Sequence, residues 1–279
     1  MPAADVGTLV AGLRGLEAID LEQPRYAGAP TFAAHQPGFS YVLHRRHELG
    51  LGAARTSASG LIVAAEHSGT HIDALCHQAE DLQMYGGCAV TAQNQTPQGF
   101  TTLGAETIPP IMARGVLLDV AATAGVQRLP AGHVVGAAEL ERAADAAGVE
   151  ASEGDVVLIR TGNATAWEDA EEYLRGPGVG AEGARWLADR RPIAVGADNV
   201  ALDPVGHTDP ELGTLPSHLV LLVRNGIYII ENLQLEELSR SGHAEFVFLC
   251  LPLKMRGVTG SPVRPLALLH THDTGRAHV

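Results

Sequence analysis

Cysteine is scarce in this sequence, and its scarcity excludes disulfide-stapled folds. The 279 residues hold only Cys76, Cys88 and Cys250, which cannot form a disulfide framework and lack the paired spacing of a cysteine metal site. The first twenty residues lack the charged start and long apolar run of a signal peptide. We therefore expect reduced thiols and a cytoplasmic location.

The sequence also has few positively charged residues and no long apolar runs. Lys and Arg number 19 against 32 Asp and Glu, a formal net charge of −13, and no basic cluster is denser than Arg45-Arg46. This balance argues against binding to nucleic acid or to an anionic membrane surface. No stretch approaches the roughly 20 uninterrupted apolar residues of a membrane span. We expect neither nucleic acid nor membrane among the partners.

The apolar residues that are present predict a folded α/β protein. They make up 46% of the chain while aromatic residues make up only 4%, so the core must come from Ala, Val, Leu and Ile. Several short apolar runs predict buried strands: Leu61 to Ala65, Gly115 to Ala121, Val156 to Arg160, Ile193 to Gly196, Ile227 to Ile230 and Phe246 to Leu253.

Helical patterns lie between these runs. Ala137 to Ala147 is stopped by Gly148, and Ala181 to Arg190 carries an apolar stripe. Ser217 is the expected N-cap of a short helix through Val223. The irregular spacing, with no GxGxxG or Walker loop, favours one α/β domain with a mixed sheet over residues 1–279, whose last ~10 residues form a tail.

One short segment concentrates groups that bind metals. His67, His71, Asp73 and His77 fall within eleven residues, all at odd positions, so an extended chain would project them to one side. Gly69 permits a bend that lets His67 and His71 converge. Imidazole and carboxylate suit Zn²⁺ or Mn²⁺, and two His with one Asp leave a position for water. His77 is either a further ligand or a proton carrier.

Other polar residues are weaker candidates. His218, on the expected short helix, and Glu231, at a strand end, gain weight only if the fold brings them to the first cluster. Asp198 and Asp203 are expected to support the fold or a ligand. Cys76 alternates away from the ligand side and is not expected to be a nucleophile.

The run His67 to His77 contains H-x-G-T-H-x-D with a further His four residues on, and this pattern resembles the metal-dependent cyclase family. Best-known members are bacterial kynurenine formamidases and isatin hydrolases. The similarity continues in Gly154 to Gly162, Val195 to Asp203 and Gly257 to Arg264. The combined match covers roughly Ile19 to Leu268.

The resemblance implies a swivelling β/β/α fold that forms homodimers or homotetramers and hydrolyses amide bonds with a divalent metal, Zn or Mn. It implies His67, His71 and Asp73 as first metal ligands, His218 and Glu231 as ligands of a second ion in two-metal members, and His77 as the general acid/base. The number of ions per chain, one or two, stays open at this point.

Two departures separate this sequence from its relatives. Formamidases usually have Pro where this chain has Leu75, and a Trp-Pro-Gly-Asp type segment where it reads Arg25 to Ala29. Glu231 is kept, whereas isatin hydrolases can lack it. We expect hydrolysis of a small amide: an aryl formamide such as N-formylkynurenine, or a cyclic amide such as isatin or a lactam. The alternatives are a cyclase or lactonase acting on carbon–oxygen bonds, and a metal-binding protein without catalysis.

Overall fold

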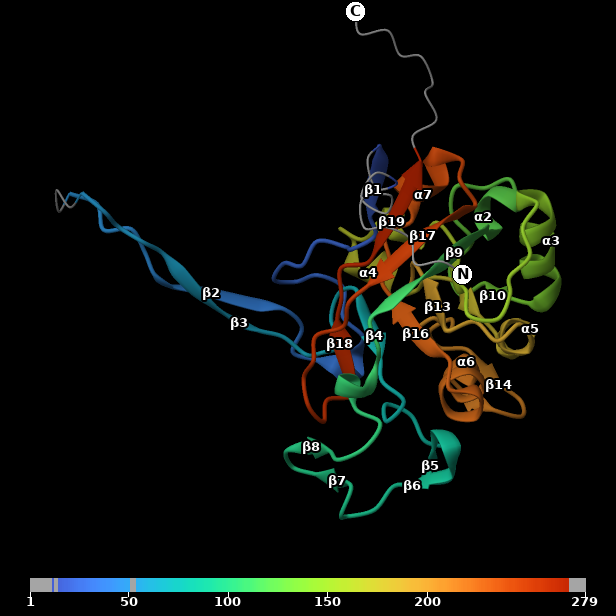
Figure 1. The fold of residues 1–279 in the computed structure, drawn as a ribbon, viewed down its shortest axis with the longest axis horizontal. Coiled ribbons are helices and arrows are strands. Elements are labelled where there is room, and N and C mark those ends of the chain that lie inside the picture. The colour runs from blue at the N-terminus through green and yellow to red at the C-terminus, as the bar shows by residue number, and fades with distance from the viewer. Residues whose placement is uncertain (1–11, 13–14, 51–53, 271–279) are drawn as a thin grey trace, which may run out of the picture.

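The computed structural model describes residue 12, residues 15–50 and residues 54–270. Its largest element is a nine-stranded mixed sheet in the order β1-β19-β17-β9-β11-β13-β16-β4-β18 (Figure 1). In that order the strands are Leu16–Asp20, Leu266–His270, Glu245–Cys250, Ile111–Asp119, Val156–Arg160, Ala194–Ala197, Tyr228–Glu231, His71–Asp73 and Gly260–Pro262. The predicted α/β fold with a mixed sheet is confirmed.

Smaller strand pairs and short helices complete the described chain. The remaining strands are β2 (Ser40–Arg45), β3 (Ser59–Val63), β5 (Gln83–Met84), β6 (Cys88–Ala89), β7 (Gln95–Thr96), β8 (Gly99–Phe100), β10 (Val134–Val135), β12 (Gly178–Val179), β14 (Thr208–Asp209) and β15 (Gly213–Thr214). The α-helices are α2 (Val120–Thr123), α3 (Ala137–Ala147), α4 (Ala170–Tyr173), α5 (Ala181–Asp189), α6 (Pro216–His218) and α7 (Glu236–Ser241). The other helical turns are η1 (Ala33–His35), η2 (Tyr85–Gly87), η3 (Ala105–Thr107), η4 (Asn163–Ala166) and the π-helix η5 (Leu219–Arg224).

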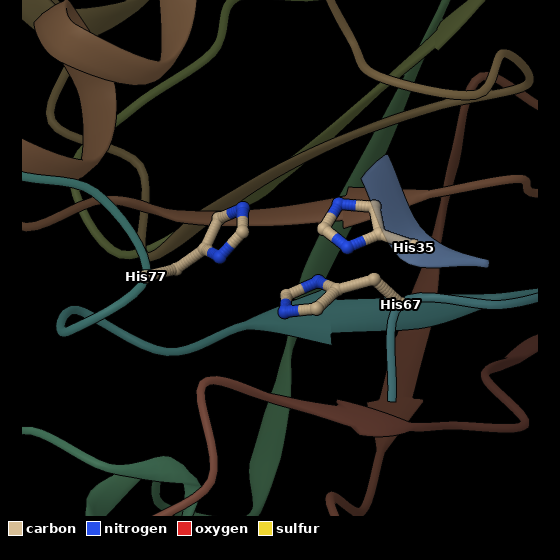
Figure 2. Close-up of side chains that lie close together, drawn as sticks. All are labelled: His35, His67 and His77. Carbon is tan, nitrogen blue, oxygen red and sulfur yellow. The ribbon is translucent and has the colours of Figure 1, made fainter. Parts of the chain in front are cut away.

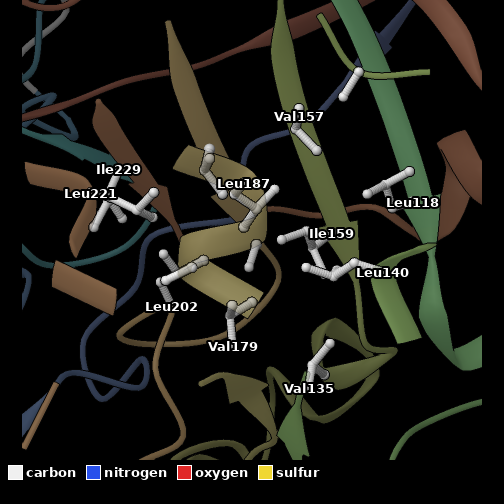
Figure 3. Close-up of a cluster of buried hydrophobic side chains, with 14 of the residues drawn as sticks. Leu118, Val135, Leu140, Val157, Ile159, Val179, Leu187, Leu202, Leu221 and Ile229 are labelled. Carbon is white, nitrogen blue, oxygen red and sulfur yellow. The ribbon is translucent and has the colours of Figure 1, made fainter. Parts of the chain in front are cut away.

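The centre of the sheet is parallel and is buried on both faces. Strands β9, β11, β13 and β16 run parallel, so their carboxyl ends meet at one edge. Val157 and Ile159 of β11 face the side covered by α3 and α5, as Figure 3 shows for Ile159 beside Leu187 and Leu140. The alternate residues of β11 pack on the opposite side. Such two-sided burial explains why these strands are continuous apolar runs in the sequence.

The two longer helices form where their patterns predict them. Helix α3 covers Ala137–Ala147 and ends at Gly148, whose φ of 66° is the left-handed conformation that glycine adopts most easily. Helix α5 buries Ala184, Leu187 and Ala188 on one stripe. The short strand β10 pairs with β12 immediately before these helices begin. Packing of both helices on the sheet gives one continuous apolar core.

Three local predictions were wrong. The Leu61 to Ala65 run is not a buried strand: β3 is exposed along its length, as half of a hairpin that projects from the body of the molecule (Figure 1). Ser217 does not cap a helix; Pro216 begins α6, and the buried Ser217 hydroxyl donates to the Val179 carbonyl at 2.7 Å. The run from His67 to His77 is not extended throughout, since only His71–Asp73 is strand and the rest forms turns.

Two predicted strands end earlier than the apolar run does. Strand β9 stops at Asp119 because the Asp119 carboxylate accepts the Ala122 N–H at 2.9 Å and starts α2. Strand β17 stops at Cys250, two residues before Pro252, which has no N–H to donate to a neighbouring strand. Within residues 12, 15–50 and 54–270, no helix has the length and apolar character needed to cross a membrane.

Candidate metal centre

Strand pairing brings distant candidate residues to one place. Strand β4 lies between β16 and β18, and the β4–β16 register sets His71 opposite Glu231. His218, on α6, reaches the same point from beside the sheet, with its Nε2 3.5 Å from Asp73 Oδ2. The five predicted ligands therefore form one group, called here the His–carboxylate cluster: His67, His71, Asp73, His218 and Glu231.

The donor atoms of this cluster lie close together and are buried. His67 Nδ1 is 2.9 Å and His71 Nε2 is 3.5 Å from Asp73 Oδ1. All five side chains are buried. Donor atoms around a tetrahedral ion with bonds of about 2.0–2.1 Å are about 3.3 Å apart, so this spacing matches a coordination shell.

Each carboxylate divides its oxygens between two sets of histidines. Asp73 directs Oδ1 toward His67 and His71, and Oδ2 toward His218. Glu231 lies 3.3 Å from His71 through Oε2 and 3.3 Å from His218 through Oε1. The cluster therefore has two adjoining halves, one containing His67 and His71 and the other containing His218, with both carboxylates between them.

Hydrogen bonds on the outer side orient the His67 ring. The Glu66 carboxylate can only accept, so the Thr259 hydroxyl donates its single proton to Glu66 Oε1 at 2.5 Å. Thr259 Oγ1 must then accept from His67 Nε2–H, 2.8 Å away. This assigns the His67 proton to Nε2 and leaves a lone pair on Nδ1, the atom that faces Asp73.

The other two histidines of the cluster are oriented in the same way. His71 Nδ1–H donates to the Gly69 carbonyl at 2.8 Å, and His218 Nδ1–H donates to Asp203 Oδ2 at 2.8 Å. In both rings Nε2 is the atom that faces the carboxylates. Asp203 also accepts the backbone N–H groups of Ser217 and His218, so it fixes both the ring and the helix that carries it.

Several inward atoms of the cluster are buried without a hydrogen-bond partner among the described residues. They are His67 Nδ1, His71 Nε2, both carboxylate oxygens of Asp73 and Glu231 Oε1. Burying so many polar atoms unpaired costs several kcal/mol unless a cation satisfies them. Imidazole nitrogens and carboxylate oxygens are the donor set of Zn²⁺ and Mn²⁺, so the residues present fit a divalent metal.

The charges of the cluster also call for a cation. Burial disfavours a charged His71, yet Asp73 and Glu231 outweigh burial and raise the pKa of His71 to about 10. Burial and Asp73 oppose ionisation of Glu231, but His218 and His71 prevail and lower its pKa. Two buried carboxylates thus draw in positive charge, which protons supply when no metal is bound.

A tight turn holds His67 and His71 in place. Gly69 adopts a φ of 65°, and a Cβ there would lie 2.4 Å from the Arg25 guanidinium. That guanidinium donates to the Ser68 and Thr70 carbonyls on either side of the glycine. Asn232 donates to the Gly69 carbonyl at 3.0 Å, the same oxygen that orients His71. The expected bend at Gly69 is therefore present.

The partner strand leaves room for the His67 ring. Gly260 of β18 lies opposite Asp73, and a Cβ at Gly260 would come within 2.7–3.1 Å of three His67 ring atoms. A side chain there would displace the ring. Sequence inspection did not single out Gly260 or Thr259, because both lie almost two hundred residues beyond His67.

His77 and a histidine that the sequence did not reveal complete the group. The His77 ring centroid is 4.1 Å from that of His67, and the ring of His35 of η1 stacks on His67 at 4.5 Å and lies 5.8 Å from His77 (Figure 2). Both residues are half-buried, unlike the five residues of the His–carboxylate cluster. His35 is one of thirteen histidines in the chain, and no spacing in the sequence links it to the cluster.

The remaining candidates lie away from the cluster or have other roles. The Cys76 thiol is buried and points to the Val258 carbonyl, 3.8 Å away, and burial raises its pKa to about 12, so it is no nucleophile. Asp198 accepts three hydrogen bonds from Thr161 and Gly162 and supports the fold. His270 belongs to β19, and the rest of the expected tail lies outside the described residues.

Comparison with known proteins gives consistent relatives. A family model described as "Putative cyclase" matches residues 19–204. Cyclase-like protein 3 of Oryza sativa subsp. japonica is 37% identical over 84 residues, which are 30% of this chain and 28% of the relative. Cyclase-like protein 2 of the same plant is 33% identical over 112 residues, 39% of this chain and 38% of the relative. The chain thus matches well under half of the length of either rice protein.

Solved structures share the fold over almost the whole chain. A crystal structure of a novel cyclase has a TM-score of 0.81 at 29% identity, covering 96% of this chain and 91% of that one. Isatin hydrolase A from Ralstonia solanacearum has a TM-score of 0.73 at 23% identity, covering 96% and 98%. Since the family model spans two thirds of the sequence and includes the segment from His67 to His77, the chain belongs to the cyclase family.

Proposed function

We propose that this protein is a metal-dependent hydrolase that cleaves the amide bond of a small molecule. The substrate class is an aryl formamide, such as N-formylkynurenine, or a cyclic amide, such as isatin or a lactam. The observation that carries this proposal is the convergence of buried, unpaired donor atoms from His67, His71, Asp73 and Glu231. The shared fold with isatin hydrolase A supports the amide class.

His67, His71 and Asp73 would hold one divalent ion, Zn²⁺ or Mn²⁺, and His218 and Glu231 would serve as ligands of a second ion if two are bound. Such a metal supplies a polarised carbonyl and water of lowered pKa. The outer partners Thr259, Gly69 and Asp203 hold one nitrogen of each imidazole in a hydrogen bond, so the other nitrogen is the one that would face an ion.

His77 is the proposed proton carrier. Burial, opposed by Asp73, lowers the pKa of His77 to about 3, so the free imidazole is neutral near pH 7. Its proposed role rests on its position, since its ring centroid lies 4.1 Å from that of His67 at the edge of the cluster. Water adds to the substrate carbonyl carbon and gives its proton to His77. His77 then passes that proton to the nitrogen as the carbon–nitrogen bond breaks, which yields a carboxylic acid and an amine.

Substitution of His77 tests this assignment. We expect His77→Ala to keep its metal and to lose about 10²–10⁴-fold in turnover, the usual contribution of a proton carrier. Metal content is measured on the purified protein, and turnover is measured on N-formylkynurenine and isatin. His44→Ala is the matched control, since His44 lies on the exposed strand β2. Loss of metal from His77→Ala would make His77 a ligand and refute the assigned role.

The substrate class is tested with the metal-loaded protein. Purified protein supplied with Zn²⁺ or Mn²⁺ is assayed on amides and on esters and lactones of matched shape. Amide cleavage is the expected result. Preference for lactones would favour carbon–oxygen chemistry, and metal binding without turnover of any compound would indicate a non-catalytic protein.

The setting we propose is the cytoplasm. Cys76, Cys88 and Cys250 form no disulfide with one another, and Cys76 and Cys250 are buried. Free thiols of this kind suit a reducing compartment. Small molecules rather than nucleic acid or membranes are the proposed partners, since the net charge of −13 opposes binding to polyanions.

A further inference from the structure

Two histidines lie beside the His–carboxylate cluster without belonging to it. His35 is the last residue of η1, and His77 lies in the turn that follows β4. Their ring centroids are 5.8 Å apart, and both rings lie against His67, His35 at 4.5 Å and His77 at 4.1 Å (Figure 2). The fold therefore gathers three imidazoles from two segments that are distant in the sequence.

The ring nitrogens of His35 and His77 are free, unlike those of the cluster. The three histidines of the cluster each have one nitrogen in a hydrogen bond to an outer partner. Within the described part of the chain, no hydrogen bond or ion pair reaches a ring nitrogen of His35 or His77. Both residues are half-buried, so dissolved ions can reach them. Each neutral ring keeps a lone pair that can bind a cation.

We propose that His35 and His77 form a separate site for a divalent transition metal, called here the two-histidine site, and that an ion bound there inhibits the enzyme. Donor nitrogens of His35, His67 and His77 all lie within 4.8 Å of one another. Two nitrogens on one Zn²⁺ ion, with bonds of about 2.0–2.1 Å, are about 3.3 Å apart, so the rings need to approach by no more than about 1.5 Å.

His67 lies against both rings but is not a ligand of the two-histidine site. Its Nε2–H donates to Thr259 at 2.8 Å, and its Nδ1 lies 2.9 Å from Asp73 Oδ1. Both nitrogens of His67 are therefore already engaged in the His–carboxylate cluster. Water completes the coordination of an ion that His35 and His77 hold.

The ligands of the two-histidine site decide which metals it accepts. Both ligands are imidazoles, and imidazole suits Zn²⁺, Ni²⁺ and Cu²⁺, whereas Mn²⁺ prefers oxygen ligands and binds more weakly. The His–carboxylate cluster adds two carboxylates to its imidazoles and so suits Mn²⁺ as well. We therefore expect the two-histidine site to bind Zn²⁺ and to bind little Mn²⁺.

An ion at the two-histidine site would stop the proposed proton transfer. Coordination uses the lone pair of His77, so the imidazole can no longer accept a proton from the attacking water. The expected inhibition thus rests on the proposed function, in which His77 is the proton carrier. Binding of the ion does not depend on that function.

Binding of metal tests the site without reference to activity. Protein whose His–carboxylate cluster is already loaded with Zn²⁺ is titrated with further Zn²⁺ in a calorimeter, and we expect one additional, weaker ion per chain. His35→Phe keeps a ring that can stack on His67 and removes both nitrogens. It should weaken the additional ion by more than the about 10–100-fold that loss of an outer partner costs, and should retain the Zn²⁺ of the cluster.

Two further variants control the titration. His44→Phe makes the same change on the exposed strand β2 and should bind Zn²⁺ as the native protein does. His35→Gln also removes the imidazole and should behave as His35→Phe does. An additional ion that both His35 variants retain would refute the site. Loss of the cluster's own Zn²⁺ from folded His35 variants, as judged by circular dichroism, would also refute it, because His35 would then belong to the cluster.

Inhibition is tested on the Zn²⁺-loaded protein with an amide that it cleaves. Excess Zn²⁺ should inhibit the native protein, whereas Mn²⁺ at the same concentration should not. In His35→Phe the concentration of Zn²⁺ that halves turnover should rise at least about tenfold, in line with the weaker binding. Equal inhibition of both proteins by Zn²⁺ would refute the inhibitory role. A protein that cleaves no amide yet binds the additional ion through His35 would overturn the proposed function and support the metal site.

Discussion

Two polar clusters lie at the same edge of the main sheet, and they differ in burial and in how their atoms are satisfied. The first is the His–carboxylate cluster. The second, called here the Arg160 cluster, consists of Arg160 with Asp119 and Glu236. Arg160 and Asp119 are paired at the carboxyl ends of β11 and β9, two strands from the end of β16 that carries Glu231.

The Arg160 cluster is complete by itself. Arg160 donates to both oxygens of Glu236 at 2.8 and 2.9 Å, to Asp119 at 2.8 Å and to the Gln127 carbonyl at 3.0 Å. Ser239 donates to the other Asp119 oxygen at 2.5 Å. No side-chain atom of these three residues is among the buried unpaired atoms found in the described chain.

The His–carboxylate cluster shows the opposite arrangement. Its outer nitrogens are paired, while its inner atoms face one another without hydrogen bonds. A polar cluster that satisfies itself stabilises the fold, whereas one that leaves inward donors unpaired is built for a missing ligand. Charge alone does not separate the two, because each cluster sets two carboxylates beside basic side chains.

Among the changes that test this comparison, substitution of Asp73 should have the largest effect on metal content and turnover. Asp73 contacts both halves of the His–carboxylate cluster, so Asp73→Ala should lose bound metal entirely and lose more turnover than the about 10²–10⁴-fold expected for a proton carrier. Elemental analysis and amide turnover are the measurements. Asp145→Ala, on the exposed side of α3, is the control. Full metal content in Asp73→Ala would show that the unpaired atoms serve some other purpose.

A substitution in the Arg160 cluster should lower the free energy of unfolding and leave the metal content unchanged. Arg160→Met leaves two carboxylates without their partner, and we expect a loss of about 3 kcal/mol in the free energy of unfolding. This is the lower end of the range for a broken buried pair, because Asp119 and Glu236 keep some access to water. Denaturant unfolding measures it, with Arg142→Met as the surface control. If Arg160→Met instead lowers the metal content and leaves the stability unchanged, the Arg160 cluster does not have the structural role assigned to it.

The smallest effect is expected from the outer partner of His218. Asp203→Asn keeps the shape of the side chain but weakens the hold on the His218 imidazole and on the backbone of α6. We expect metal affinity to fall about 10–100-fold with the fold intact. Titration with a competing chelator measures the affinity, and Asp189→Asn serves as the control. Unchanged affinity would mean that α6 alone orients His218.

Local patterns in the sequence predicted most of the central sheet. Val156 to Arg160 matches β11 residue for residue, because a strand buried on both faces must be apolar throughout. Ala137 to Ala147 matches α3 because Gly148 ends it. The same logic failed at Leu61, since an apolar strand in an exposed hairpin has the same composition as one in a core.

The sequence alone predicted some of the candidate ligands better than others. His67, His71 and Asp73 stood out because a turn and a three-residue strand keep them close along the chain. Glu231 and His218 became part of the group only through the β4–β16 register and the approach of α6. The sequence did not predict His35, because the β2–β3 hairpin separates it from His67 along the chain while the fold stacks the two rings.

By itself, the order of residues determined that this chain builds an apolar α/β core and gathers two histidines and an aspartate within seven positions. Tertiary structure decided which distant groups face them and which ring nitrogens are held by Thr259 and Asp203. It also decided that the apolar β2–β3 hairpin lies outside the core. The physical reason is that spacing along a chain specifies neighbours only within a turn or a strand. Contacts between distant segments depend on strand register and packing.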